Sequence, residues 1–205
     1  EIKRSEFIGH IKRVSTVEEA RAYIESVRKT YHDARHVCSA FIIGADRDIQ
    51  RSSDDGEPAG TAGVPMMQAL LARQTREDGS TDLSDVVAVV VRYFGGIKLG
   101  AGGLVRAYTD AVVQTLDGAL FDSRERLRVG RVPSSHADAG RLENEIRAAG
   151  LNVLGTEYGA EGATISLGVF DRPEELERAE ELVVSLSSGA ASVTWGDTQW
   201  VDLPV

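Results

Sequence analysis

The chain has 205 residues, of which 42% are hydrophobic and 27% charged, which suits a soluble globular protein with one large or two small domains. The longest apolar run, residues 86–91, is far too short to span a membrane, and the single Cys38 excludes an internal disulfide and a cysteine-based zinc site. The net charge of −9 disfavours tight nonspecific DNA binding, and we expect a cytoplasmic protein without membrane contact.

In the first part of the chain, apolar runs predict strands over 7–14, 36–43 and 85–91. Helical periodicity predicts helices over 15–31, 61–73 and from the glycines near 100 to about 116, the first opened by a capping box of Ser15 and Glu18. The polar segment 45–60 predicts a hairpin tip followed by an ordered loop, and 76–84 predicts a surface loop.

The second part begins at 117–123, where glycine and polar residues predict a domain boundary. The order that follows is strand, helix, two strands, helix, strand, which is the βαββαβ or ferredoxin-like arrangement. We therefore predict an α+β protein with domains 1–121 and 122–205, which carry net charges of −2 and −7. The predicted elements of the second domain are strands 124–132, 151–158, 163–170 and 191–201 and helices 134–149 and 171–186, the last with Asp171 as its cap.

The stretch RYFGGIKLGAGGLVRAY at 92–108 places a glycine-rich turn between a buried strand and a helix start. Free N–H groups at such a turn, with basic side chains nearby, can hold an anion. The glycine spacing fits neither a dinucleotide fingerprint nor a P-loop, and a tight connection whose glycines serve packing explains it equally well. The candidate phosphate or RNA ligands are Arg92, Lys98, Gly100, Gly102, Gly103 and Arg106.

Asp54, Asp55 and Glu57 bring three carboxylates into one short loop. Oxygen ligands of this kind suit Mg²⁺ or Ca²⁺, but the spacing does not match a calcium loop, and turn hydrogen bonds or helix capping explain the residues as well. We assign no metal and no cofactor.

Two further patterns have ordinary explanations beside functional ones. His36 and Cys38 share one face of a predicted strand, as a nucleophile pair would, although a cysteine within an apolar strand is more often inert. Arg124, Arg126 and Arg128 alternate along another strand without stacking aromatics, which favours a solvated edge strand over an RNA-binding face.

The segments SSDDGEPAGTAG at 52–63 and VVRYFGGIKLGAGGLVRAY at 90–108 resemble the Impact/YigZ family, and the resemblance covers essentially the whole chain. Val37 and Ala59 depart from the family pattern, which usually has Asn and Ser there. The resemblance implies a ribosomal-protein-S5 domain-2-like first domain, a ferredoxin-like second domain and a role in the regulation of translation, with no catalytic residue.

The leading hypothesis is a non-enzymatic binding protein whose first domain contacts RNA or the ribosome, with a protein partner on the acidic second domain. A Mg²⁺-dependent enzyme acting on a nucleotide or another phosphorylated small molecule in the same cleft is the alternative, and a hydrolase using Cys38 and His36 is a third.

Overall fold

The computed structural model describes residues 1–203 of the chain. The chain divides into two units, Glu1–Phe121 and Asp122–Val205, and each is described by itself. Both units combine helices with an antiparallel four-stranded sheet, which confirms the predicted α+β class. No helix within residues 1–203 has the length and apolar character needed to cross a membrane.

The sheet of unit 1 has the strand order β1-β4-β2-β3. Its strands are β1 (Glu6–Arg13), β2 (His36–Ile43), β3 (Ile49–Ser53) and β4 (Val86–Tyr93). The interior strand β4 pairs with β1 on one side and with β2 on the other. Successive side chains of β4 point to opposite faces, so Val87 and Val89 enter one core while Ala88 and Val90 enter the other. The unbroken apolar run at 86–91 therefore reflects burial on both faces.

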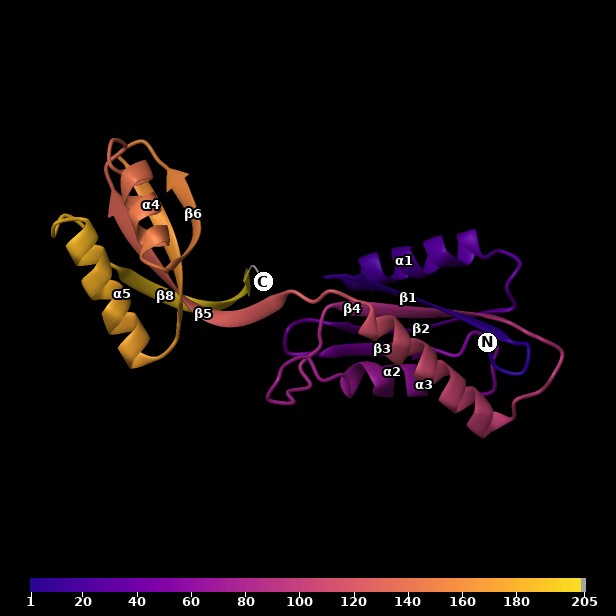
Figure 1. Ribbon diagram of the computed structural model, residues 1–205. Helices are drawn as coiled ribbons and strands as arrows, with labels where there is room; N and C mark the ends of the chain where they lie inside the picture. The colour runs from indigo at the N-terminus through magenta and orange to yellow at the C-terminus, as the bar shows by residue number, and fades with distance from the viewer. Residues whose placement is uncertain (204–205) are drawn as a thin grey trace. The chain divides into compact units, whose positions relative to one another are not determined.

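Helices cover both faces of this sheet (Figure 1). α1 (Val17–Thr30) lies on one face, and α2 (Gly63–Leu71) and α3 (Ala101–Asp117) lie on the other. α1 begins one residue later than the predicted capping box: the Thr16 Oγ1 accepts from the N–H of Glu19, and the Glu19 carboxylate accepts from the N–H of Ser15. The return bond goes to the residue before the N-cap, whereas in a capping box it goes to the N–H of the N-cap itself.

The polar segment predicted as a hairpin tip and loop contains the edge strand β3. All five of its side chains are exposed, and it pairs only with β2 among the described strands. An edge strand with no buried face need not alternate apolar and polar residues, so the sequence pattern did not predict β3 as a strand.

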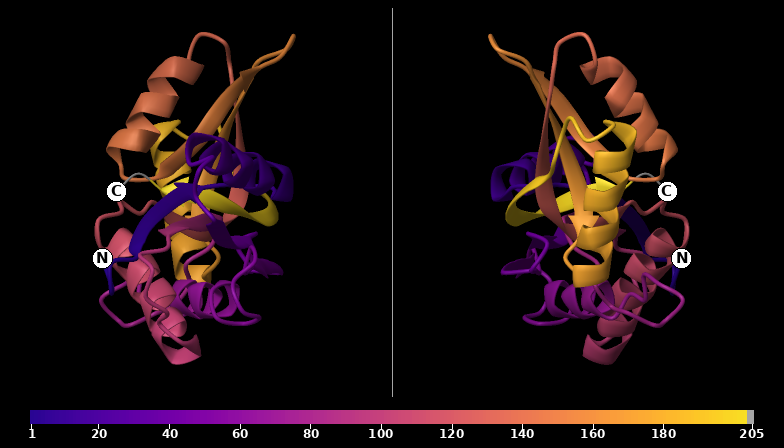
Figure 2. Two further views of the ribbon diagram at one scale, coloured as in Figure 1. Left: turned by 90° about the vertical axis from the view of Figure 1, so that its right-hand side faces the viewer. Right: turned by 90° about the vertical axis from the view of Figure 1, so that its left-hand side faces the viewer.

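Unit 2 has the element order β5-α4-β6-β7-α5-β8 and the strand order β6-β7-β5-β8. α4 and α5 pack on the same face of this sheet, where Leu142, Ile165 and Val183 share one core (Figure 2). The elements are β5 (Ser123–Ser134), α4 (Ala139–Ala148), β6 (Asn152–Tyr158), β7 (Ala163–Phe170), α5 (Pro173–Leu186) and β8 (Thr194–Leu203).

The helix predicted over 134–149 begins only at Ala139, because β5 extends to Ser134, and two expectations for single residues of unit 2 are also wrong. β5, which carries Arg124, Arg126 and Arg128, is an interior strand between β7 and β8, not an edge strand. α5 has Arg172 at its N-cap followed by Pro173, because the carboxylate of Asp171 binds the guanidinium of Arg128 instead of capping the helix.

His10 provides a pH-dependent contribution to the stability of unit 1. Its Nε2 is buried without a hydrogen-bond partner among the described residues, and its ring lies 5.2 Å from that of Tyr31. Burial lowers the pKa of His10 below the usual 6.5, so the neutral form is favoured in the folded protein. The stabilisation is complete above pH 6.5 and is lost as the pH falls through the lowered pKa, since the unfolded chain then binds more protons.

We expect His10→Phe to flatten the decline of the free energy of unfolding between pH 7 and pH 5, because the substitution removes a ring that must stay neutral when folded. Urea titrations at both pH values measure this decline, with His32→Phe at an exposed site as the matched control. An unchanged decline in His10→Phe, or an equal change in His32→Phe, would contradict the assignment.

Candidate nucleic-acid interface

The glycine-rich turn leaves the end of β4 and leads into α3. Gly96 and Gly100 have φ of 86° and 76°, a region that other residues enter only with strain. Gly95 serves a close approach, because a Cβ there would lie 2.0 Å from the carbonyl carbon and oxygen of Arg4. The fold therefore requires glycine at positions 95, 96 and 100, independently of any ligand.

The amino end of α3 has no capping side chain. Gly100 is the N-cap, and the N–H of Leu104 makes the first helical bond to the Gly100 carbonyl at 3.0 Å. The N–H groups of residues 101–103 have no acceptor within the helix. A Cβ at Gly102 would meet nothing within 4 Å, and its φ is not positive, so neither crowding nor backbone conformation requires glycine there.

Lys98 precedes this helix end in the chain and Arg106 lies in the second turn of α3, and both are exposed. Arg106 makes a loose ion pair with Asp110, four residues along the helix, with 3.6 Å between the charged atoms. Gly103 is half-buried, and a Cβ there would touch the side chain of Leu99 at 3.0 Å.

Arg92 differs from these two cations because it is buried. The Arg92 Nη1 donates to Glu57 Oε1 at 2.6 Å, and both side chains are at most 6% exposed. Tyr108 of α3 donates its hydroxyl to the same oxygen at 2.8 Å. The acidic loop and the glycine-rich segment thus meet inside unit 1, and Arg92 holds them together instead of presenting its charge at the surface.

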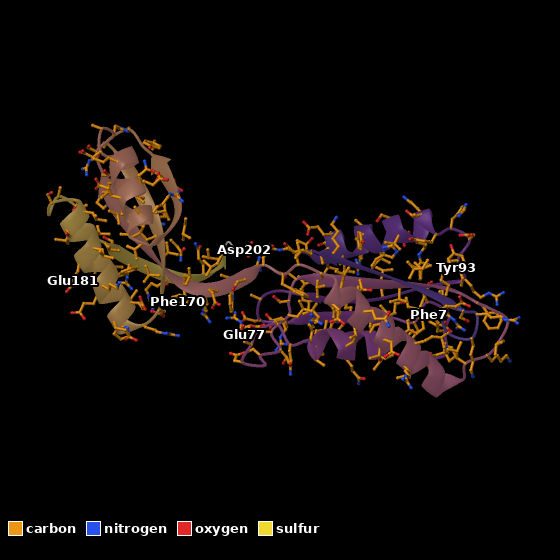
Figure 3. The ribbon with its side chains drawn as sticks, in the orientation of Figure 1. Phe7, Glu77, Tyr93, Phe170, Glu181 and Asp202 are labelled. Carbon is orange, nitrogen blue, oxygen red and sulfur yellow. The ribbon has the colours of Figure 1, made fainter. Side chains whose placement is uncertain are left out.

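Aromatic rings enclose the Arg92 side chain. Its guanidinium carbon lies 5.5 Å from the ring centroids of Phe7 and Phe94. The ring of Phe7 also meets Tyr108 edge to face at 5.3 Å. Figure 3 labels Phe7 and Tyr93 at this end of the sheet.

Asp54 and Asp55 stabilise the acidic loop from within. Asp54 accepts hydrogen bonds from the N–H groups of Gly60, Ala62 and Gly63, and so caps α2 from a distance in sequence. Burial raises the pKa of Asp54, but these three backbone donors outweigh it, and the net pKa is lowered. Asp55 accepts from the side chain of Arg28 at 3.0 Å and from the N–H of Val37 at 2.7 Å.

These carboxylates are engaged by donors of the protein, which argues against the magnesium hypothesis. Residues 1–203 also contain no group of three or more His, Cys, Asp or Glu side chains placed to hold a metal ion. The carboxylates of this loop accept hydrogen bonds from backbone N–H groups and arginine side chains of unit 1.

Cys38 and His36 face the same loop but do not form a catalytic pair. Cys38 is fully buried, with its sulfur 3.0 Å from the Asp54 carbonyl oxygen and 3.3 Å from the Tyr108 hydroxyl. Burial raises the pKa of the Cys38 thiol to about 12. The Nδ1 of His36 bonds the Asp55 carbonyl at 2.9 Å, and its Nε2 lies 4.0 Å from Glu57. The ring therefore supports the loop.

Lys3 and Arg4 are two basic residues at this end of the sheet that the sequence analysis missed. Both are exposed, and the close approach of Gly95 to Arg4 places them beside the glycine-rich turn. No motif marks them, since their position depends on the antiparallel pairing of β1 with β4.

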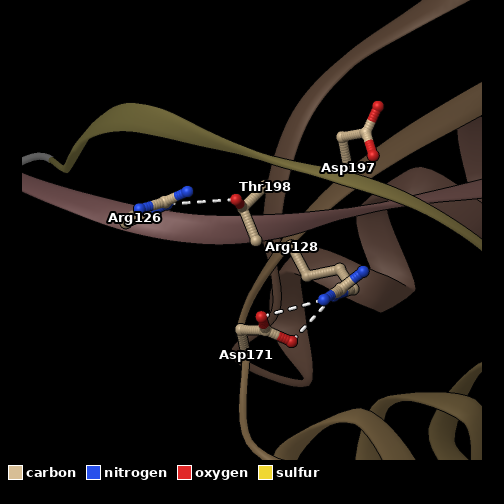
Figure 4. A pocket seen from close by; sticks show the side chains of 5 residues that line it. All are labelled: Arg126, Arg128, Asp171, Asp197 and Thr198. Carbon is tan, nitrogen blue, oxygen red and sulfur yellow. Dashed lines mark hydrogen bonds and ion pairs between the residues drawn. The ribbon is translucent and has the colours of Figure 1, made fainter.

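Unit 2 has an open pocket of about 600 Å³ (Figure 4). Arg128 binds Asp171 through two bonds of 2.7 and 2.9 Å, and Arg126 donates to Thr198 at 3.0 Å. The basic side chains of this pocket are thus engaged by neighbours, and it is a weaker candidate than the surface of unit 1. Its lining residues are Arg126, Arg128, Asp171, Asp197 and Thr198.

We expect Glu57→Ala to lower the free energy of unfolding by roughly 3–5 kcal/mol, because it leaves Arg92 as a buried charge without its partner. Asp117→Ala is the matched control, since it removes the exposed partner of Arg73 and should cost at most about 1 kcal/mol. Urea unfolding measures both, and equal losses would contradict the role of the buried pair.

Cys38 should not react with an aromatic disulfide reagent at pH 8 in the folded protein, because its thiol is buried and its pKa is near 12. In urea the same reagent should titrate one thiol per chain. Ser52→Cys adds an exposed thiol as a positive control. Rapid reaction of native Cys38 would restore the cysteine-hydrolase hypothesis.

Comparisons with known proteins agree with this two-unit architecture. The model of the Impact N-terminal domain matches residues 3–116, and that of a domain of unknown function, DUF1949, matches residues 135–190. A solved structure described as the crystal structure of a hypothetical protein is 32% identical with a TM-score of 0.63, covering 94% of this chain and 89% of that one.

Curated relatives carry the name of the same family. IMPACT family member YvyE of Bacillus subtilis is 36% identical over 204 residues, covering 100% of this chain and 89% of the relative. IMPACT family member YigZ of Escherichia coli is 49% identical over 118 residues, covering 57% of this chain and 54% of the relative. On the domain match and the full-length similarity to YvyE, the chain belongs to the IMPACT family.

Proposed function

We propose that this protein is a non-enzymatic binding protein of translation that contacts RNA, including the RNA of the ribosome, through unit 1. The observation that carries the proposal is the uncapped amino end of α3, which exposed Lys98 precedes in the chain and which carries exposed Arg106 in its second turn. Backbone N–H groups, the positive end of a helix dipole and two cations together form a site for phosphate oxygens. We call Phe94, Ile97, Lys98, Gly100, Gly102 and Arg106 the glycine-loop surface.

Gly102 supports this use of the helix end. Glycine inside a helix lowers stability by as much as about 1 kcal/mol relative to alanine, and unit 1 has no steric need for it at 102. The missing side chain leaves room for a phosphate to approach the first turn. Glycine at 103 avoids a close contact with the side chain of Leu99, and its N–H is a further donor at the proposed phosphate site.

The electrostatics of the chain are consistent with a local binding surface. The carboxylates of Asp54 and Glu57 are engaged inside unit 1, while Lys98 and Arg106 remain exposed. Residues 122–205 carry a net charge of −7 and would repel a polyanion. We therefore assign RNA binding to unit 1 and a protein partner, or an orienting role, to unit 2.

The finer fold assignments belong to the same proposal. The βαββαβ order and the strand order β6-β7-β5-β8 support a ferredoxin-like unit 2. Family membership supports an S5 domain-2-like unit 1, a fold shared with RNA-contacting domains, and a cytoplasmic location. Likeness of fold alone is a weak warrant, so the proposal depends on the surface itself.

We expect Lys98→Ala and Arg106→Ala each to weaken cosedimentation with ribosomes at low salt, because each removes a phosphate contact and reduces the salt dependence of binding by about one counterion. Lys29→Ala, an exposed substitution in α1 on the other face of the sheet, should leave binding unchanged.

Gly102→Ala should weaken cosedimentation with ribosomes, while urea unfolding should show the stability of unit 1 raised by as much as about 1 kcal/mol.

Gly140→Ala in α4 is the matched control for Gly102→Ala, since it too is exposed with open space at the Cβ. It should add stability and leave binding unchanged. Absence of ribosome binding by the unsubstituted protein at low salt would refute the proposed function. Unchanged binding by Gly102→Ala would remove the helix end from the site.

A further inference from the structure

A tight turn at residues 2–5 holds two basic residues in an unfavourable backbone conformation. The N–H of Ile2 bonds the Ser5 carbonyl and the N–H of Ser5 bonds the Ile2 carbonyl, both at 2.9 Å. The two central residues, Lys3 and Arg4, have φ of 48° and 63°. Turns of this kind strongly favour Asn and Gly, because other residues are strained at positive φ. Such strain at two adjacent exposed cations points to a use outside the fold.

Contacts with β4 and the glycine-rich turn fix the position of this basic turn. The N–H of Gly95 donates to the Ser5 hydroxyl at 3.2 Å, and the missing side chain of Gly95 admits the Arg4 peptide. Glu6 then pairs with Tyr93 at the start of the β1–β4 ladder. Lys3 and Arg4 are therefore neighbours of the glycine-loop surface.

Two apolar side chains are exposed in the same place. Phe94 directly precedes Gly95 and Ile97 directly precedes Lys98 in the chain, and each side chain is 43% exposed. Arg92 lies against the Phe94 ring, at 5.5 Å, and helps to hold it at the surface. Phe94 is thus an exposed aromatic ring that lies between Arg92 and Lys98 in the chain and next to Gly95, which admits the Arg4 peptide.

We propose that the basic turn and the glycine-loop surface together bind single-stranded RNA, in preference to a duplex. This inference rests on the proposed function and specifies its substrate class. Unpaired bases can stack on an aromatic ring and pack against an aliphatic side chain, whereas bases in a duplex present their faces to one another. Phe94 and Ile97 contact bases, and Lys3, Arg4 and Lys98 contact phosphates.

The arrangement of charge and apolar groups favours this ligand. Cations alone would bind any polyanion, with an affinity set by salt. Exposed apolar side chains among the cations add a contribution that requires accessible base faces and tolerates sequence differences. The same surface should therefore discriminate between the two forms of RNA more than between sequences.

The test uses the full chain and fluorescence anisotropy, with a labelled 12-nucleotide oligouridylate and a 12-base-pair RNA duplex as probes. We expect the single strand to bind at least tenfold more tightly. Phe94→Ala and Ile97→Ala should each weaken single-strand binding about tenfold and leave duplex binding unchanged, and Phe94→Trp should preserve it. Ile49→Ala, an exposed apolar substitution at the opposite end of the sheet, is the matched control.

The cations are tested through the salt dependence of binding. Replacing Lys3 and Arg4 together by Ala should reduce the slope of log affinity against log salt by about 1.4, the value for two phosphate contacts on a single strand. Because Lys3 and Arg4 are exposed and strained where they are, the double variant should fold, and circular dichroism checks this for every variant.

The outcomes separate this inference from the proposed function. Equal binding of the two probes, or full single-strand affinity in both Phe94→Ala and Ile97→Ala, would overturn the inference and leave RNA binding intact. Binding of neither probe at low salt would overturn the inference, and absence of ribosome cosedimentation beside it would overturn the proposed function as well. Binding to anionic phospholipid vesicles without RNA binding would also overturn both, since the surface would then serve a membrane.

Discussion

The buried interaction of Glu57 with Arg92 and Tyr108 is the constraint on which the rest of unit 1 depends. It joins the loop before α2, the end of β4 and the second turn of α3, three segments far apart in the chain. A buried ion pair is not by itself a strong source of stability, but removing one partner leaves a charge without solvation. The interaction therefore acts chiefly by specifying where the loop and the helix must lie, and the exposed turn between them inherits that position.

In unit 1 the acidic side chains of this loop point inward while basic side chains stay exposed. Asp54, Asp55 and Glu57 are used as acceptors by backbone amides and by buried or half-buried arginines, so little of their charge is presented outward. Lys98, before the amino end of α3, and Arg106, in its second turn, remain exposed, as does Lys3 in the turn beside Gly95. An acidic protein can in this way carry a local surface of opposite potential, which net charge alone would not reveal.

Much of the fold could be predicted, because burial on both faces or on one face imposes periods that are visible in the sequence. β2 and β7 have the predicted bounds, and β4 and α3 differ by a residue or two at their ends. β3 could not be predicted, since none of its side chains is buried, and the cap of α5 could not, since Asp171 pairs with an arginine on another strand. The exposure of Lys98 and Gly102 agrees with their proposed use, whereas the burial of Arg92 and the position of Lys3 and Arg4 depend on tertiary contacts that no local pattern encodes.

The position of β4 in the sheet has a consequence for biosynthesis. β1 and β2 are made first, yet they are not neighbours, and both wait for a partner that follows β2 by more than 40 residues of chain. During translation, which proceeds at roughly 5–20 residues per second, their edges remain without that partner until β4 has left the exit tunnel. Contacts so distant in sequence also slow folding, because the intervening chain must lose its freedom first. The nascent protein is thus open to capture by chaperones until its sixth element has emerged, and the last strand of the first sheet to be synthesised is the one that closes its centre.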